Sequence, residues 1–243
     1  MISSQRFFPS PRASSARASS PRPLPGCAFG LLLLAACMLC ACEESNDGSS
    51  KVNGSIHVLA GESPGAVETV NGNIDIDPDA AVTAAKTVNG AIRLGAHATA
   101  DSLTTVNGGI RIDSAARVSG GADSVNGSIT LGEAAQVGGS LENVNGAIDL
   151  SAAHVAGGIA TVNGDIDVGA RSRVERGILV KKADNAFIHF GQQVPRIVIG
   201  PGASVGGELR FEREVKLYVS DRATIGTVVG ATAIRFSGDA PPG

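Results

Sequence analysis

The stretch TVNGAIRLG, residues 87–95, contains the motif V-N-G-x-I, which occurs seven times in this chain of 243 residues. The motif asparagines recur every 18 or 19 residues, at Asn53, Asn71, Asn89, Asn107, Asn126, Asn145 and Asn163. A period this regular is typical of a solenoid, whose repeats are stable only when they stack on their neighbours. The repeat therefore predicts a stack of similar coils.

Each repeat contains short apolar segments separated by Gly-rich corners. An apolar-x-apolar strand such as Ile92–Leu94 follows the V-N-G, and later repeats add apolar positions such as Val137 and Leu141. Alternation with a period of two residues indicates strands. Within TVNGAIRLG, Val88 is expected to fill the coil together with the strand residues, and Gly90 to adopt a positive φ at a corner.

We expect an all-β fold, a single-stranded right-handed parallel β-helix of about ten coils of roughly 18–20 residues. Regular coils cover residues 52–180, an excursion loop covers 181–196, degenerate coils cover 197–236, and a tail covers 237–243. Right-handedness is expected from the crossover preference of parallel strands. The seven motif asparagines are expected to stack along the axis and to hydrogen-bond amide to amide.

The N-terminal segment has a different composition. Residues 1–36 carry four Arg and no acid, and the apolar run 26–42 is short for a membrane span. The sequence LAAC at 34–37 resembles the lipobox of bacterial lipoproteins. The resemblance implies a signal peptide over 1–36, lipid attachment at Cys37 and a flexible tether over 37–51, with Cys42 as the alternative lipidated residue. It also implies a lipid-anchored location in the cell envelope, at the outer membrane or facing the periplasm.

Composition excludes several classes of function. The formal net charge is -3, and the surplus of acid after residue 36 argues against a nucleic-acid partner. All four Cys precede residue 43, so the remainder has no disulfide framework. The four His (57, 97, 154 and 189) lack metal-ligand spacing, and the glycines recur as corner residues rather than as a phosphate loop. No metal and no cofactor are expected.

The repeated V-N-G-x-I-x-[ILV] units resemble bacterial adhesin-type domains of unknown function that form β-solenoids. The units IGPGASVGGEL (199–209) and VSDRATIGTVV (219–229) are also similar to bactofilins, polymer-forming proteins with a triangular β-helix. Together the resemblance covers about residues 52–236. It implies a solenoid fold and supplies no catalytic residues.

An enzymatic role is the alternative to a binding or structural role. The outward residues of the apolar-x-apolar strands are His57, Asp75, Arg93, Arg111, Thr130, Asp149 and Asp167. Asp149 and Asp167 would lie about 4.8 Å apart, near the carboxylate separation of retaining glycosidases. Asp75 and Arg93 would form a surface ion pair. Because polar residues must cover an outward face in any case, these residues do not require an active site.

The expected function is therefore non-enzymatic, that of an envelope scaffold or adhesin. Self-association through the coil ends is the first alternative, because the N-terminal edge at 52–58 carries no obvious cap. A polysaccharide-binding or polysaccharide-degrading protein is the second alternative. The expected partners are the membrane through the lipid, a second copy, and an envelope protein or polysaccharide.

Overall fold

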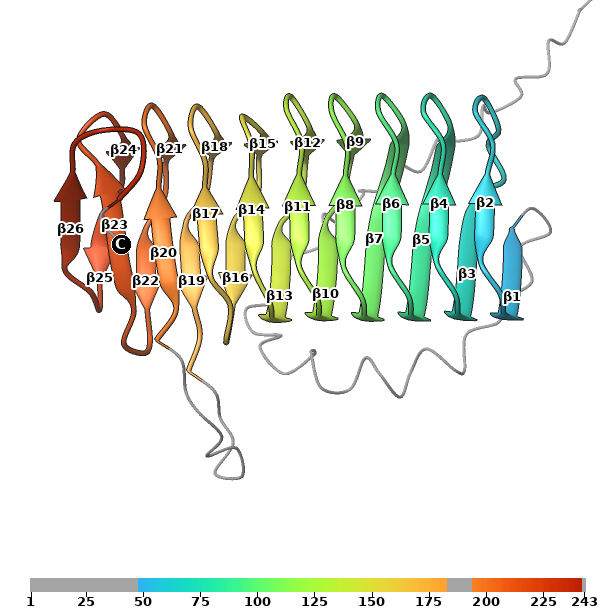
Figure 1. The fold of residues 1–243 in the computed structure, drawn as a ribbon, viewed down its shortest axis with the longest axis horizontal. Helices are drawn as coiled ribbons and strands as arrows, with labels where there is room; N and C mark the ends of the chain where they lie inside the picture. The colour runs from blue at the N-terminus through green and yellow to red at the C-terminus, as the bar shows by residue number, and fades with distance from the viewer. Residues whose placement is uncertain (1–47, 183–193, 242–243) are drawn as a thin grey trace, which may run out of the picture. The chain divides into compact units, whose positions relative to one another are not determined.

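The computed structural model describes residues 48–182 and 194–241 (Figure 1). These residues form parallel strands that stack as a β-solenoid of about ten turns, and the described residues contain no helix. The prediction of an all-β parallel solenoid is confirmed. Its right-handedness stays a prediction. Within the described ranges, no helix is long and apolar enough to cross a membrane.

The strands form three faces of the stack. The first face holds the strands that lead into V-N-G or its equivalent: β1 (Ser49–Asn53), β3 (Ala66–Asn71), β5 (Ala81–Asn89), β7 (Thr99–Asn107), β10 (Ala122–Asn126), β13 (Leu141–Asn145), β16 (Ile159–Thr161), β19 (Ile178–Val180), β22 (Leu209–Phe211) and β25 (Val228–Val229). The second face holds the apolar-x-apolar strands: β2 (Ile56–Val58), β4 (Ile74–Ile76), β6 (Ile92–Leu94), β8 (Ile110–Ile112), β11 (Ile129–Leu131), β14 (Ile148–Leu150), β17 (Ile166–Val168), β20 (Arg196–Ile199), β23 (Lys216–Ser220) and β26 (Ala233–Phe236).

The third face holds shorter strands: β9 (Arg117–Val118), β12 (Gln136–Val137), β15 (His154–Val155), β18 (Arg173–Val174), β21 (Ser204–Val205) and β24 (Thr224–Ile225). The long strands β5 and β7 run from the third face into the first. For this reason β7 pairs with both β9 and β10, which joins the two faces into one 16-stranded sheet.

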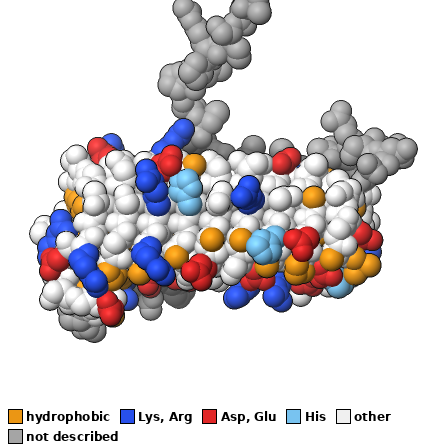
Figure 2. Space-filling view, turned by 90° about the horizontal axis from the view of Figure 1, so that it is seen from above, with side chains coloured by type: hydrophobic (Ala, Val, Ile, Leu, Met, Phe, Trp, Pro, Cys, Tyr) orange, Lys and Arg blue, Asp and Glu red, His pale blue; other side chains and the backbone are white. Residues whose placement is uncertain are grey.

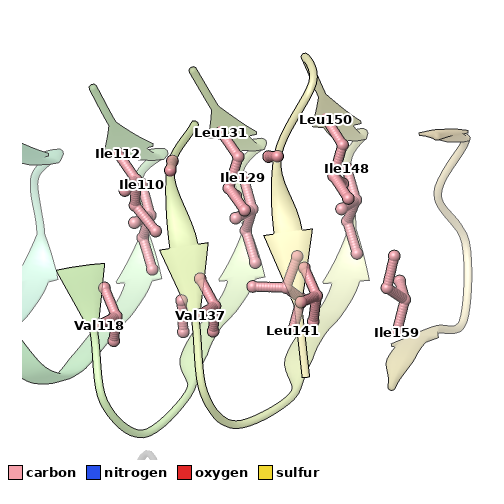
Figure 3. Close-up of a cluster of buried hydrophobic side chains, with 14 of the residues drawn as sticks. Ile110, Ile112, Val118, Ile129, Leu131, Val137, Leu141, Ile148, Leu150 and Ile159 are labelled. Carbon is pink, nitrogen blue, oxygen red and sulfur yellow. The ribbon is translucent and has the colours of Figure 1, made fainter. Parts of the chain in front are cut away.

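The core consists of rows of identical or similar aliphatic side chains. Ile110, Ile129 and Ile148 are register partners on successive strands of the second face and are at most 1% exposed (Figure 3). Fully burying such a side chain contributes about 1.5–3 kcal/mol. Because each coil supplies only a few of these side chains, a coil gains this burial only against the coils above and below it.

The V-N-G valine does not fill the coil, contrary to the prediction. Val88 is half-buried on the outward side of β5, and the preceding residue Thr87 is buried instead. The reason is the alternation of the strand, in which Ala85 and Thr87 face inward. The Thr87 hydroxyl donates a hydrogen bond to the carbonyl oxygen of Gly72 in the previous coil, at 2.9 Å. The same bond recurs from the equivalent side chains Thr69, Thr105, Ser124 and Asn143.

The motif glycines are required mainly by close packing of backbones, and not by a positive φ as predicted. Among them only Gly54 and Gly146 have positive φ. A Cβ added to Gly90 would lie 1.9 Å from the carbonyl oxygen of Gly72, the glycine stacked beneath it. Real Cβ atoms do not approach oxygen that closely, so neighbouring coils exclude a side chain at this corner.

The corner after most second-face strands is a tight turn with a residue of positive φ. This residue is a non-glycine in six successive coils: Asp79, His97, Ala115, Ala134, Ala152 and Arg171. The N–H of the following residue bonds back three residues, as from Ala116 to the carbonyl of Asp113 at 3.2 Å. In the next coil Pro201 and Gly202 occupy the turn, in the positions that a type II turn favours.

The stack begins earlier than predicted, because β1 starts at Ser49 and pairs with β3. Of the predicted excursion, residues 183–193 lie outside the described residues, and so do Cys37, Cys42 and the signal segment. The two described ends of the excursion are bonded to the stack. The Lys182 N–H donates to Glu212 at 3.4 Å, and the Arg196 N–H donates to Asp165 at 2.8 Å.

Candidate functional site

The seven motif asparagines form one continuous row at the corner between the first and second faces. All seven side chains are exposed, and six amide-to-amide bonds of 2.9–3.1 Å join each to the next. In every bond the Nδ2 of the later coil donates to the Oδ1 of the earlier one. The row thus joins seven coils through side chains, in parallel with the backbone pairing.

The row ends at Arg213, which sequence reasoning did not identify. Its Nη1 donates to the carbonyl oxygen of Val162 at 3.0 Å and to the Oδ1 of Asn163. A guanidinium can only donate, so the Asn163 atom beside it must be the oxygen. Its nitrogen then faces Asn145, and this orientation is repeated along the whole row.

The outward row of the second face is in register as predicted, but its ion pairing differs. Arg93 bonds Asp113 at 2.9 Å rather than Asp75, and Arg111 bonds the same carboxylate at 2.7 Å. Asp113 lies at the corner after β8, where both guanidinium groups reach it. Hydrogen bonds from the two arginines outweigh the cost of partial burial and lower the pKa of Asp113.

A second ion pair lies near the start of the row. Asp77 bonds His57 at 2.7 Å, and this bond raises the pKa of the His57 imidazole.

The two candidate catalytic carboxylates lie side by side. Asp149 on β14 is the register partner of Asp167 on β17. Burial, assisted by Asp165 for Asp149 and by Asp149 for Asp167, raises the pKa of both groups. Raised carboxylate pKa values occur in active sites and also wherever like charges share a surface.

A second carboxylate pair lies on the outward side of the first face. Asp123 and Glu142 are register partners on β10 and β13. Burial, reinforced by the Glu142 charge, raises the pKa of Asp123 to about 6. Glu142 also borders a shallow groove of about 250 Å³, whose floor includes Gly158, Ala160 and Gly177. The groove exists because the small side chain of Ala160 lies between those of its larger register partners, Glu142 and Leu179.

Both ends of the stack carry a cation at a core-facing position. Lys51 is the register partner of the buried Thr69, and its Nζ donates to the Ser55 carbonyl at 3.0 Å. Arg235 is the register partner of the buried Val219, and its Nη1 donates to the Ser220 carbonyl at 3.2 Å. Inward-pointing charges are one device by which proteins block exposed sheet edges. The sequence offered no sign of these caps, because their function depends on register.

The remaining surface is mixed in charge. On the side that Figure 2 shows, acidic and basic side chains are interspersed among small and polar residues. No group of three or more metal-ligating side chains occurs within residues 48–182 and 194–241. His97 lies at a positive-φ corner, and His154 contacts Glu175 at 3.0 Å. His189 lies outside the described residues.

Comparison with known proteins gave no match to a family model, to a curated protein or to a solved structure.

Proposed function

We propose that this protein is a non-enzymatic scaffold or adhesin of the bacterial cell envelope, with the solenoid as its binding body. The observation that supports this proposal most strongly is the continuity of the stack. The row of hydrogen-bonded asparagine side chains runs through seven coils with little variation. Such repetition supports a regular surface and leaves few positions for a specialised pocket. The resemblance of the V-N-G units to adhesin-type β-solenoid domains supports the same proposal.

The envelope location rests on the LAAC sequence at 34–37. Lipid on Cys37 would anchor the chain, with about 0.8 kcal/mol of membrane affinity per buried methylene. Mass spectrometry of the mature N-terminus tests this directly. A diacylated peptide beginning at Cys37 supports the proposal, and Cys37→Ser should then release the protein from the membrane fraction. An unmodified N-terminus on a cytosolic protein would end the proposal.

A polysaccharide-acting enzyme is the competing candidate, and Asp149 beside Asp167 is the observation that favours it. Acidic polysaccharides would be incubated with wild-type protein and with the Asp149→Ala and Asp167→Ala variants. We expect no turnover by wild type. Turnover that both variants abolish, while Asp75→Ala retains it, would replace the scaffold proposal with an enzymatic one.

Self-association through the coil ends is the second alternative. Within the described ranges, the exposed large hydrophobic side chains lie in the first and last coils: Val52, Leu59, Val229 and Ile234. Lys51 and Arg235 oppose stacking, because a second copy would bury each cation. Electron microscopy of concentrated protein separates the cases, since stacking produces filaments that lengthen with concentration.

A further inference from the structure

The outward row of the second face carries charges that are complementary to themselves. Across the central strands β6, β8, β11, β14 and β17, successive register partners are Arg93, Arg111, Thr130, Asp149 and Asp167. Two cations precede Thr130 and two anions follow it. A two-fold axis through Thr130 that lies in the plane of the face, parallel to the strands, sets each arginine position of one copy against an aspartate position of a second copy.

The charged side chains of this row can form further ion pairs with another molecule. Arg93 and Arg111 are 61% and 65% exposed, although both contact Asp113. Each guanidinium has five N–H donors, so several remain for another acceptor. Asp149 and Asp167 lie against each other, and Arg196 offsets only part of the resulting repulsion at Asp167.

The positions that flank the row allow another chain to approach. They are mostly Gly, Ala or Ser: Ala91, Gly95, Gly109, Ser128, Gly132, Ala147, Ser151 and Gly169. Two flanking positions are charged, Asp113 and Asp165. The same two-fold rotation keeps the position along the strand, so it sets Asp113 against Ser151 and Asp165 against Ala91, and no like charges oppose each other.

We propose that the second face is a homodimer interface, in which two copies pair face to face and antiparallel about an axis at Thr130. Arg111 of one copy then meets Asp149 of the other, and Arg93 meets Asp167. An isologous contact of this kind is the usual basis of two-fold dimers. The charge complementarity ends where Asp75 would face Val198. It therefore covers five strands, a length of about 24 Å at 4.8 Å per coil. Such a small contact predicts association in the micromolar range.

Charge exchange tests the pairing. The full chain, with its four cysteines replaced by serine, would be followed by sedimentation up to about 200 μM. Wild type should form a dimer that weakens as salt rises. Arg93→Asp with Arg111→Asp should raise the dimer Kd at least tenfold, as should Asp149→Arg with Asp167→Arg. Combining all four substitutions should restore the wild-type Kd within about threefold, because the complementarity is merely reversed.

Disulfide cross-linking at the proposed two-fold axis is a second test. In the same cysteine-free background, Thr130→Cys should form an intermolecular disulfide under mild oxidation, since two copies of residue 130 meet. Thr104→Cys, outward on the first face, is the matched control and should form no intermolecular disulfide. The proposal is overturned if wild type is monomeric throughout, if the fourfold variant fails to recover, or if Thr130→Cys does not cross-link. Assemblies that grow beyond dimers would identify the coil ends as the interface instead.

Discussion

At the scale of single residues, the inward polar row of the first face is the unexpected part of the core. Thr69, Thr87 and Thr105 are at most 4% exposed, yet each hydroxyl has an acceptor on the glycine of the previous coil. A buried hydroxyl is costly unless it is bonded, and these bonds remove that cost. The row ends at Thr161, whose Oγ1 has no partner within the described residues.

The Thr87 hydroxyl is hydrogen-bonded, whereas the Thr161 hydroxyl has no partner within the described residues. Replacement by valine should therefore affect stability differently at the two positions. Thr87→Val removes a satisfied hydrogen bond and should lower the free energy of unfolding by about 1 kcal/mol. Thr161→Val removes an unsatisfied hydroxyl and should be neutral or stabilising. Urea unfolding followed by circular dichroism measures both. Equal losses from the two variants would show that the hydroxyl bonds do not contribute as inferred.

Asp123 predicts a pH dependence of stability. Its folded pKa of about 6 lies above its ordinary value of 3.8, so the fold disfavours the ionised form. The resulting destabilisation is absent below pH 4, grows as the pH rises from 4 to 6, and is complete above 6. The shift corresponds to at most about 3 kcal/mol.

Asp123→Asn should therefore stabilise the protein at pH 7 and have little effect at pH 4. Urea midpoints at the two pH values provide the measurement. Glu68→Gln, an outward position on the same face, is the control and should show no comparable difference. A variant with no gain at pH 7 would contradict the assigned cause.

At the scale of a corner and its strands, the stacked motif glycines set the spacing of the coils. Gly90→Ala places a Cβ 1.9 Å from the Gly72 carbonyl and must displace backbone. We expect a loss above about 3 kcal/mol, the range of severe packing defects. Gly109→Ala is the control, since Ala91 and Ala147 occupy the same position in other coils.

The control should change the urea midpoint much less, because the new Cβ would lie 3.1 Å from the Ser128 carbonyl oxygen, a tight contact that a shift of a few tenths of an ångström relieves. If both glycine variants unfolded at the same urea concentration, close coil packing would not be the reason for the motif glycine.

The sequence pattern predicted the strands of the second face well and the corners less well. Apolar pairs such as Ile92 and Leu94 alternate with a period of two residues, which only a strand satisfies. The inward position of Thr87 was not predicted, because the core was inferred from apolar residues and threonine is polar. The positive φ at Ala115 and Ala134 was missed because alanine gives no turn signal; the neighbouring coils, and not the residue, impose that conformation.

At the scale of the whole stack, the end cations predict how assembly is prevented. Lys51→Thr and Arg235→Val restore the residue types of the rows that these cations interrupt. The double variant should form filaments at high concentration, because both edges then match a further coil. Electron microscopy at increasing concentration measures the outcome.

Lys86→Thr, an outward substitution on β5, is the control and should leave the size of the protein unchanged. If the double variant stayed as small as the control, the cations would not be what blocks the ends. If the parent protein itself formed filaments, the caps would be ineffective, and self-association through the coil ends would become the better account of function.

No inspection of local sequence could have found the end of the asparagine row. The bond joins Arg213 to Asn163, 50 residues apart. Only the register of the later coils brings the two residues together. The order of the charged residues in the row around Thr130 likewise becomes visible only when the strands are aligned by their register.

The fixed orientation of the amide row gives the solenoid an electrical direction. Seven amide groups point the same way, so their dipoles add along the axis as peptide dipoles do in a helix. The positive end lies at Asn53 and the negative end at Asn163, where the Arg213 cation compensates it. Turning one amide by 180° would set donor against donor, so the row holds a single polarity. One guanidinium thereby determines the direction of a field that runs through seven coils.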